Sequence, residues 1–294
     1  MRELKIFAVV AFFTGALYWG VEPFAHTQLH PHVEAPDYTY ADTDDVRKGK
    51  TGNVAAGKSL IVDQFQCQSC HSMTVDGNKI GSSMDLGVMT PDLTTAGLIY
   101  DDRYLAAFIA DPAKAAQVAH KFVDGAMHPM SKFDLNYDGT FGDDDAQGVA
   151  DIVAFLKSIA PKELTNQEVF ADACQRCHSI KYGDFYGGTM AAKGDVSKYM
   201  GTTPPDLSQY IRSRSKGYLH EFINEPGKHL HGTAMPRVGL TLDAENQVVQ
   251  YMEEVGDSKK PERDALAGPF LGYLVIFAIF ALLWKSKVWR DRKS

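Results

Sequence analysis

The sequence predicts an all-α chain in which two tandem helical domains lie between an N-terminal and a C-terminal transmembrane helix. Three observations lead to this prediction. A Cys-x-x-Cys-His pentapeptide occurs twice, a longer pattern follows each copy in the same order, and apolar runs lie near both ends of the chain. With 294 residues, the chain is long enough for two small domains and additional segments.

The two apolar runs have the length and the flanking residues of membrane anchors. Residues 4–21 (LKIFAVVAFFTGALYWGV) form a marginal span that ends in aromatic residues and shows no small-residue cleavage site, which favours an uncleaved anchor over a signal peptide. Residues 269–284 (PFLGYLVIFAIFALLW) contain no charge, and the basic tail KSKVWRDRKS follows them. The positive-inside rule then predicts two cytoplasmic termini and a periplasmic middle, in a two-pass protein of the bacterial inner membrane.

Charge is distributed unevenly along the chain. The net charge is -7, although the last ten residues carry five basic side chains and one acidic one. The middle of the chain is therefore strongly acidic, which does not suit binding to nucleic acid. An acidic surface suits either a basic protein partner or simple solvation.

The repeated pentapeptide is the attachment signature of c-type haem. Two thiols about one helical turn apart reach the two vinyl groups of one porphyrin, and the adjacent His ligates the iron from the proximal side. Because the two copies use all four cysteines of the chain, we expect two haem c groups. The predicted attachment residues and proximal ligands are Cys67, Cys70, His71, Cys174, Cys177 and His178.

Zinc binding and dithiol redox chemistry are the alternative interpretations of these cysteines. A zinc site made from all four thiols would leave both trailing histidines unexplained. A thioredoxin-like dithiol would need a βαβ context, which the sequence does not show.

The longer repeat predicts a duplicated domain. After the first pentapeptide come TPDLT (residues 90–94) and YLAAFIADP (residues 104–112), and after the second come PPDLS (residues 204–208) and YLHEFINEP (residues 218–226). Each nine-residue stretch has helical apolar spacing and is closed by Pro. Apolar spacing also predicts a closing helix in each copy, over residues 147–160 and 243–255.

These patterns divide the chain into seven expected segments. They are a transmembrane anchor (1–21), an extended periplasmic connector (22–43), two haem domains (44–160 and 161–257), a linker (258–267), a second transmembrane anchor (268–285) and a basic cytoplasmic tail (286–294).

Each haem iron also needs a sixth ligand, and a thioether would favour the reduced iron. Met235 is the candidate in the second copy because it follows the Pro-closed helix. In the first copy the spacing Met-x-x-hydrophobic-x-Leu favours Met130, with Met127 as the rival and His128 as a third candidate. Irons with both axial sites filled transfer electrons and do not readily bind a substrate.

An acidic stretch between Met130 and the first closing helix fits the calcium-loop pattern D-x-N-x-D-G-x5-D. It has Asp where position twelve usually has Glu, and no helix is predicted to enter it. Two interpretations of this stretch therefore stay open, a loop that binds Ca²⁺ and a solvated acidic insertion. The candidate ligands are Asp134, Asn136, Asp138, Thr140 and Asp145.

Each half of the chain between the anchors resembles a class I cytochrome c domain. In the second half, GTTPPDLSQYIRSRSKG (residues 201–217) and AMPRVGL (residues 234–240) resemble the haem-facing and axial-Met loops of cytochrome c1. The two haem domains and the opening EPFAHTQLHPHV are similar to the dihaem cytochrome c subunit of bacterial menaquinol–cytochrome c reductases. This resemblance implies that Arg212 and Arg214 pair with haem propionates.

The resemblance implies an electron-transfer subunit of a quinol–cytochrome c oxidoreductase that is not catalytic by itself. Its partners would be cytochrome b and a Rieske iron–sulfur protein, with a soluble cytochrome c or a terminal oxidase as acceptor. The alternatives are the dihaem subunit of a cbb3-type oxidase, a dihaem cytochrome c peroxidase and an electron acceptor for a periplasmic dehydrogenase. The anchor with a basic tail disfavours the oxidase subunit, and the two Met candidates disfavour the peroxidase.

Overall fold

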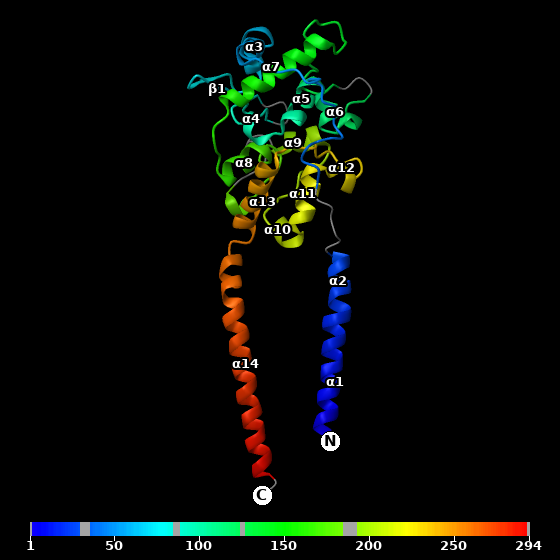
Figure 1. Cartoon of the computed structure of the whole chain (residues 1–294), viewed down its shortest axis with the longest axis vertical. Coiled ribbons are helices and arrows are strands. Elements are labelled where there is room, and N and C mark those ends of the chain that lie inside the picture. The colour runs from blue at the N-terminus through cyan, green and yellow to red at the C-terminus, as the bar shows by residue number, and fades with distance from the viewer. Residues whose placement is uncertain (1, 30–35, 85–88, 124–126, 185–192, 293–294) are drawn as a thin grey trace.

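The computed structural model describes residues 2–29, 36–84, 89–123, 127–184 and 193–292. The described chain is mostly helical, as predicted, and has two long helices that extend side by side from one end of a helical body (Figure 1). The two chain termini lie at the far ends of these helices.

The N-terminal helix is longer than predicted. It consists of α1 (Arg2–Ala16), a π-helical turn (Leu17–Val21) and α2 (Glu22–Leu29), and residues 22–29 were expected to be an extended connector. Helical backbone continues from Ala16 through Glu22, so the chain does not break at the aromatic belt. The next residues of the expected connector, 30–35, lie outside the described part of the chain.

The C-terminal helix α14 (Lys260–Asp291) also begins before its predicted start at residue 268. Pro261 lies in its first turn, where a missing N–H costs nothing. Pro269 lies inside the helix, and the helix continues beyond it to Asp291. By length and composition, Glu3–Gln28 and Lys260–Asp291 are each able to cross a membrane, and their apolar windows are not buried against the body.

The body has two lobes with similar orders of elements. The first lobe contains α3 (Val54–Ser59), β1 (Met73–Val75), β2 (Asn78–Ile80), α4 (Ala96–Ile99), α5 (Asp102–Ala110), α6 (Pro112–Ala115) and α7 (Asp143–Ile159). The second lobe contains α8 (Asn166–Ala173), α9 (Lys193–Met200), α10 (Tyr210–Ser213), α11 (Lys216–Asn224), α12 (Pro226–His229) and α13 (Leu242–Gly256).

In the first lobe, α3 and α5 pack on α7 around the buried residues Ile61, Leu105 and Val149. The backbones of α3 and α7 approach so closely that a Cβ on Gly57 would lie 2.0 Å from the Asp151 carbonyl oxygen. The antiparallel hairpin of β1 and β2 was not predicted, although its Asp76-Gly77 turn is a known hairpin signal.

In the second lobe, α8 and α11 pack on α13 around Phe170, Leu219 and Val248. The closing helices α7 and α13 match the predicted stretches closely. α7 begins four residues early because Asp145 accepts a hydrogen bond from the Gly142 N–H (2.7 Å) and so caps an additional turn.

The two lobes are joined through their backbones. The Asp101 N–H donates to the Gly239 carbonyl, and the Thr241 N–H donates to the Ile99 carbonyl, both at 2.9 Å. Between them, Tyr100 and Leu240 form an isolated antiparallel bridge. Gly239 and Leu240 end the predicted axial-Met loop of the second lobe (residues 234–240), so this loop is anchored to the first lobe.

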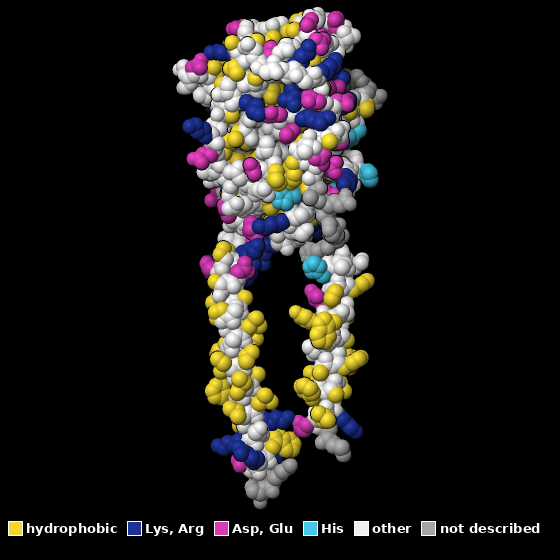
Figure 2. Space-filling model, in the orientation of Figure 1, with side chains coloured by type: hydrophobic (Ala, Val, Ile, Leu, Met, Phe, Trp, Pro, Cys, Tyr) yellow, Lys and Arg dark blue, Asp and Glu magenta, His cyan; other side chains and the backbone are white. Residues whose placement is uncertain are grey.

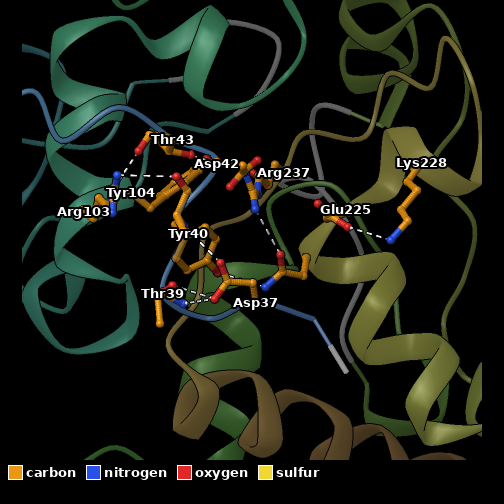
Figure 3. A network of polar contacts seen from close by, with 12 residues as sticks. Asp37, Thr39, Tyr40, Asp42, Thr43, Arg103, Tyr104, Glu225, Lys228 and Arg237 are labelled. Atoms are coloured by element: carbon orange, nitrogen blue, oxygen red, sulfur yellow. Dashed lines mark hydrogen bonds and ion pairs between the residues drawn. The ribbon is translucent and has the colours of Figure 1, made fainter. Parts of the chain in front are cut away.

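Residues 37–43, which we name the strap, lie across this junction (Figure 3). The buried Tyr40 hydroxyl donates to the Leu240 carbonyl (2.6 Å). Asp42 pairs with the buried Arg237 of the second lobe (2.7 Å), while Arg103 of the first lobe donates to the Thr43 carbonyl (2.7 Å). The strap therefore contacts both lobes and links them to the N-terminal helix.

We expect Gly239→Ala to loosen the junction. Gly239 has φ +75°, and a Cβ there would lie 1.9 Å from the ring of Tyr104. The left-handed backbone and the overlap together should lower the free energy of unfolding by about 2–5 kcal/mol. Thermal melting followed by circular dichroism measures this loss.

Gly77→Ala is the matched control for this change. Gly77 has φ +77°, and an added Cβ meets nothing within 4 Å. This variant should lower the free energy of unfolding only by the cost of the left-handed backbone, about 1 kcal/mol. Equal destabilisation by the two variants would show that the Tyr104 overlap contributes nothing.

Candidate functional site

The first Cys-x-x-Cys-His pentapeptide folds into one tight turn. Cys67–Ser69 forms a 3₁₀ turn, and the N–H groups of Cys70 and His71 both donate to the Cys67 carbonyl, at 3.2 and 2.9 Å. Both thiols are half-buried, and neither is paired in a disulfide. This turn places the two thiols and the imidazole on one short loop, as haem attachment requires.

The His71 ring is held in one tautomer by the Pro-Asp-Leu loop. Its Nδ1 lies 2.9 Å from the Pro91 carbonyl oxygen. Because a carbonyl oxygen only accepts, Nδ1 carries the proton and Nε2 keeps its lone pair for a metal. Burial lowers the pKa of this imidazole below its ordinary value, so the ring is neutral at pH 7.

The loop that holds His71 is itself tied to the pentapeptide. The Leu93 N–H donates to the Ser72 carbonyl (2.8 Å), and the Ser72 hydroxyl donates to Asp92 (2.6 Å). Pro-Asp-Leu therefore has a local role in orienting the proximal His.

The second pentapeptide repeats this arrangement. The N–H groups of Cys177 and His178 donate to the Cys174 carbonyl at 3.1 and 2.9 Å. The His178 Nδ1 donates to the Pro205 carbonyl at 2.9 Å, and the Leu207 N–H donates to the carbonyl of the Ser after His178 at 2.8 Å. Burial lowers the pKa of His178 as it does that of His71.

Three of the four thiols lack the lowered pKa of a redox-active cysteine. Burial raises the pKa of Cys67 to about 11 and that of Cys174 to about 12, and it raises the pKa of Cys177 as well. Redox-active cysteines react as thiolates, so these raised pKa values disfavour the dithiol interpretation. Within the described ranges, no three His, Cys, Asp or Glu side chains are grouped as a metal site.

A haem c group fits this donor set. Each pentapeptide offers two thiols for thioether bonds and one neutral imidazole with a free Nε2. These are the residue types and the protonation state that covalent haem and proximal iron ligation need.

The candidates for the sixth ligand differ in exposure. Met130 and Met235 are half-buried, whereas Met127 is 85% exposed. His128 is packed edge-on against Phe108 and Phe122. Exposure thus favours Met130 over Met127, and the ligand assignment itself stays a prediction.

Arg212 and Arg214 lie in and just after α10, a few residues beyond the Pro-Asp-Leu loop that holds His178. Both side chains are exposed and line a cavity near the start of α14. The Arg214 Nη1 donates to the Ser213 carbonyl (3.3 Å), and its guanidinium lies over the Tyr218 ring. Pairing of these arginines with haem propionates remains a prediction.

Three carboxylates of the acidic loop accept hydrogen bonds from N–H groups of the same loop. The Asp145 oxygens accept from the N–H groups of Leu135 (2.6 Å) and Gly142 (2.7 Å), and Asp145 is fully buried. Asp138 accepts from Thr140, and Asp134 accepts from the Gly139 N–H (2.7 Å). Three of the five predicted calcium ligands therefore already accept hydrogen bonds within the loop. Calcium binding gains no support from this geometry and remains a prediction, as do Asn136 and Thr140 as ligands.

Arg176 is a feature of the site that the sequence did not identify. It belongs to the second pentapeptide, yet its Nη1 donates to the Met89 carbonyl of the first lobe (3.4 Å), and it also hydrogen-bonds Tyr100. Its positive charge adds to the effect of burial in lowering the pKa of His71. Among the described residues its buried Nε has no hydrogen-bond partner. A positive charge from one attachment loop therefore lies beside the other.

Comparison with known proteins supports the haem interpretation for the first lobe. Residues 54–160 match the family model of cytochrome c. This match supports a cytochrome c domain, which carries haem c and transfers electrons. The same comparisons found no match among curated proteins and none among solved structures.

We expect Arg176→Gln to lower the midpoint potential of one haem. A nearby positive charge disfavours the oxidised iron, so its removal should lower the potential by on the order of tens of millivolts. Redox titration of the visible spectrum measures this shift.

Two controls separate charge from structure. Arg176→Lys keeps the charge and should retain most of the potential. Arg47→Gln removes a charge that pairs with Asp45, close in sequence to the first lobe, and should leave the midpoint potential unchanged. Potentials that are identical in wild type and Arg176→Gln would contradict the prediction.

Proposed function

We propose that this chain is a membrane-anchored dihaem cytochrome c that transfers electrons from the Rieske centre of a quinol–cytochrome c reductase to a soluble cytochrome c or a terminal oxidase. The observation that carries the proposal is the repeated geometry of the two attachment loops. The Nδ1–carbonyl distance is 2.9 Å in both, to Pro91 and to Pro205.

The second haem is inferred from this repeat. The family match covers the first lobe, and the second lobe has the same pentapeptide turn, the same Pro-Asp-Leu bond and a similar order of helices. A chain that needed one haem would not need a second neutral imidazole oriented by the same contacts.

The protein's part in electron transfer is to fix the two irons and set their potentials. Haem c, when bound, supplies the one-electron chemistry. His71 and His178 would be the proximal ligands, and Met130 and Met235 would be the distal ones. The backbone bonds between the lobes hold the two sites at a fixed separation.

The membrane arrangement is inferred from the two long helices. Figure 2 shows both covered with hydrophobic side chains, and charged side chains lie at their far ends. There, Lys285 pairs with Glu3 at 2.5 Å. With this basic end in the cytoplasm, both haem sites lie in the periplasm of the bacterial inner membrane.

The partners are inferred from the resemblance of residues 201–217 and 234–240 to cytochrome c1 loops. On that ground they are cytochrome b and a Rieske iron–sulfur subunit, with a soluble cytochrome c or a terminal oxidase as acceptor. The two Met candidates favour electron transfer over peroxide chemistry, since a peroxidase needs one open iron site.

We expect two covalent haems per chain. The pyridine haemochrome spectrum of the denatured wild type should give two haems per polypeptide. Replacing Cys67 and Cys70 with Ala, or Cys174 and Cys177 with Ala, should leave one haem in each case. One haem in the wild type, or no loss in the second double variant, would rule out the dihaem assignment.

We also expect purification in a mild detergent to retain the partner subunits. Mass spectrometry should identify a cytochrome b and a Rieske protein in the same complex as the wild-type chain. Co-purification with oxidase subunits or with a periplasmic dehydrogenase instead would favour one of the alternative functions.

A further inference from the structure

A cavity of about 370 Å³ lies where the second lobe meets the C-terminal helix. It is formed by α10, the first residues of α11, the end of α13 and the first turns of α14. Figure 2 shows dark blue Lys and Arg side chains gathered at the point where the α14 leg leaves the body.

The cavity has a surplus of positive charge. Five basic and two acidic side chains line it. Glu253 pairs with Lys216 (2.6 Å) and Lys260, and Asp257 pairs with Arg263 through two contacts of 2.6 and 2.7 Å. Both acidic groups are therefore already engaged.

Arg212 and Arg214 carry the positive charge that the two acidic side chains of the cavity do not balance. Among the residues that the structure describes, the Arg212 guanidinium forms no hydrogen bond and no ion pair. Arg214 donates to the Ser213 carbonyl (3.3 Å), which neutralises no charge, and it lies over the Tyr218 ring (5.4 Å to its centroid). Neither of these planar, fork-shaped donors forms an ion pair with a carboxylate, although the charge of Arg212 contributes to lowering the pKa of the nearby Asp257. Guanidinium groups recognise phosphate oxygens in pairs.

The position of the cavity along α14 matches the headgroup layer of a membrane. Residues 265–284 contain no charged side chain, and a helix of about 20 residues spans the hydrocarbon core of about 30 Å. Arg263 is two residues before this run. The cavity therefore lies just outside the hydrocarbon core if α14 spans the bilayer.

We propose that this cavity binds a phosphate group and that its source is the headgroup of an anionic phospholipid in the outer leaflet. The proposal rests on the membrane arrangement described above. Arg212 and Arg214 provide the principal contacts, in place of the pairing with haem propionates expected from the sequence, and Lys216 and Lys260 complete the positive field. A free phosphate anion is the other source of the same chemistry.

Native mass spectrometry of the full-length haem-loaded chain in detergent tests the proposal. Phosphatidylglycerol, phosphatidylcholine and inorganic phosphate are the probes, each added separately. The wild type should retain phosphatidylglycerol in preference to phosphatidylcholine. The double variant Arg212→Gln/Arg214→Gln should retain about tenfold less phosphatidylglycerol, since it loses two charge-assisted contacts.

The matched control is Lys114→Gln/Lys132→Gln. It also removes two positive charges, from a cavity of about 510 Å³ in which acidic side chains outnumber basic ones. This control should retain phosphatidylglycerol as the wild type does. If inorganic phosphate shows no arginine-dependent binding, equal retention of the two lipids by the wild type would overturn the proposal. Under the same condition, equal loss of phosphatidylglycerol in the two double variants would also overturn it.

The remaining outcomes are also decisive. Arginine-dependent binding of inorganic phosphate without phosphatidylglycerol would support the phosphate site and assign it a soluble source. Loss of a co-purifying subunit from the arginine variant, with lipid retention unchanged, would make the cavity a protein contact and overturn the proposal. Carbonate extraction of the wild type from membranes tests the anchor separately, because it does not depend on the arginines.

Discussion

The antiparallel contact between residues 99–101 and 239–241 is the constraint on which the rest of the structure depends. Two backbone hydrogen bonds of 2.9 Å cross it, and the strap covers it through Tyr40 and through Asp42, which pairs with the buried Arg237. Electron transfer between two centres needs a fixed separation. This contact would fix the separation of the two proposed haem sites, because it joins the segment shortly after the Pro-Asp-Leu loop of the first lobe to the segment shortly after Met235 in the second.

Much of the candidate site could be predicted from local sequence. Cys-x-x-Cys-His and Pro-Asp-Leu act over short distances, and the structure shows His71 and His178 each bonded to the carbonyl of the loop Pro. The amphipathic stretches became α5 and α11, and the closing helices became α7 and α13. In these cases the residues that determine the structure are neighbours in the chain.

The parts that sequence did not predict depend on distant residues. Arg176 occupies a variable position of its pentapeptide, and its contact with Met89 arises from the packing of the two lobes. The strap looked like an extended connector because Asp42 and Arg237, its strongest pair, are far apart in sequence. The calcium pattern likewise did not reveal that Asp145 would be used to cap α7.

The strap also has a consequence for the order of folding. Tyr40 and its partner Leu240 are separated by 200 positions, so the strap leaves the ribosome long before the residues that bury it exist. Contacts at such separations form late and slowly. The strap can therefore dock between the two lobes only after the last part of the second lobe has been made.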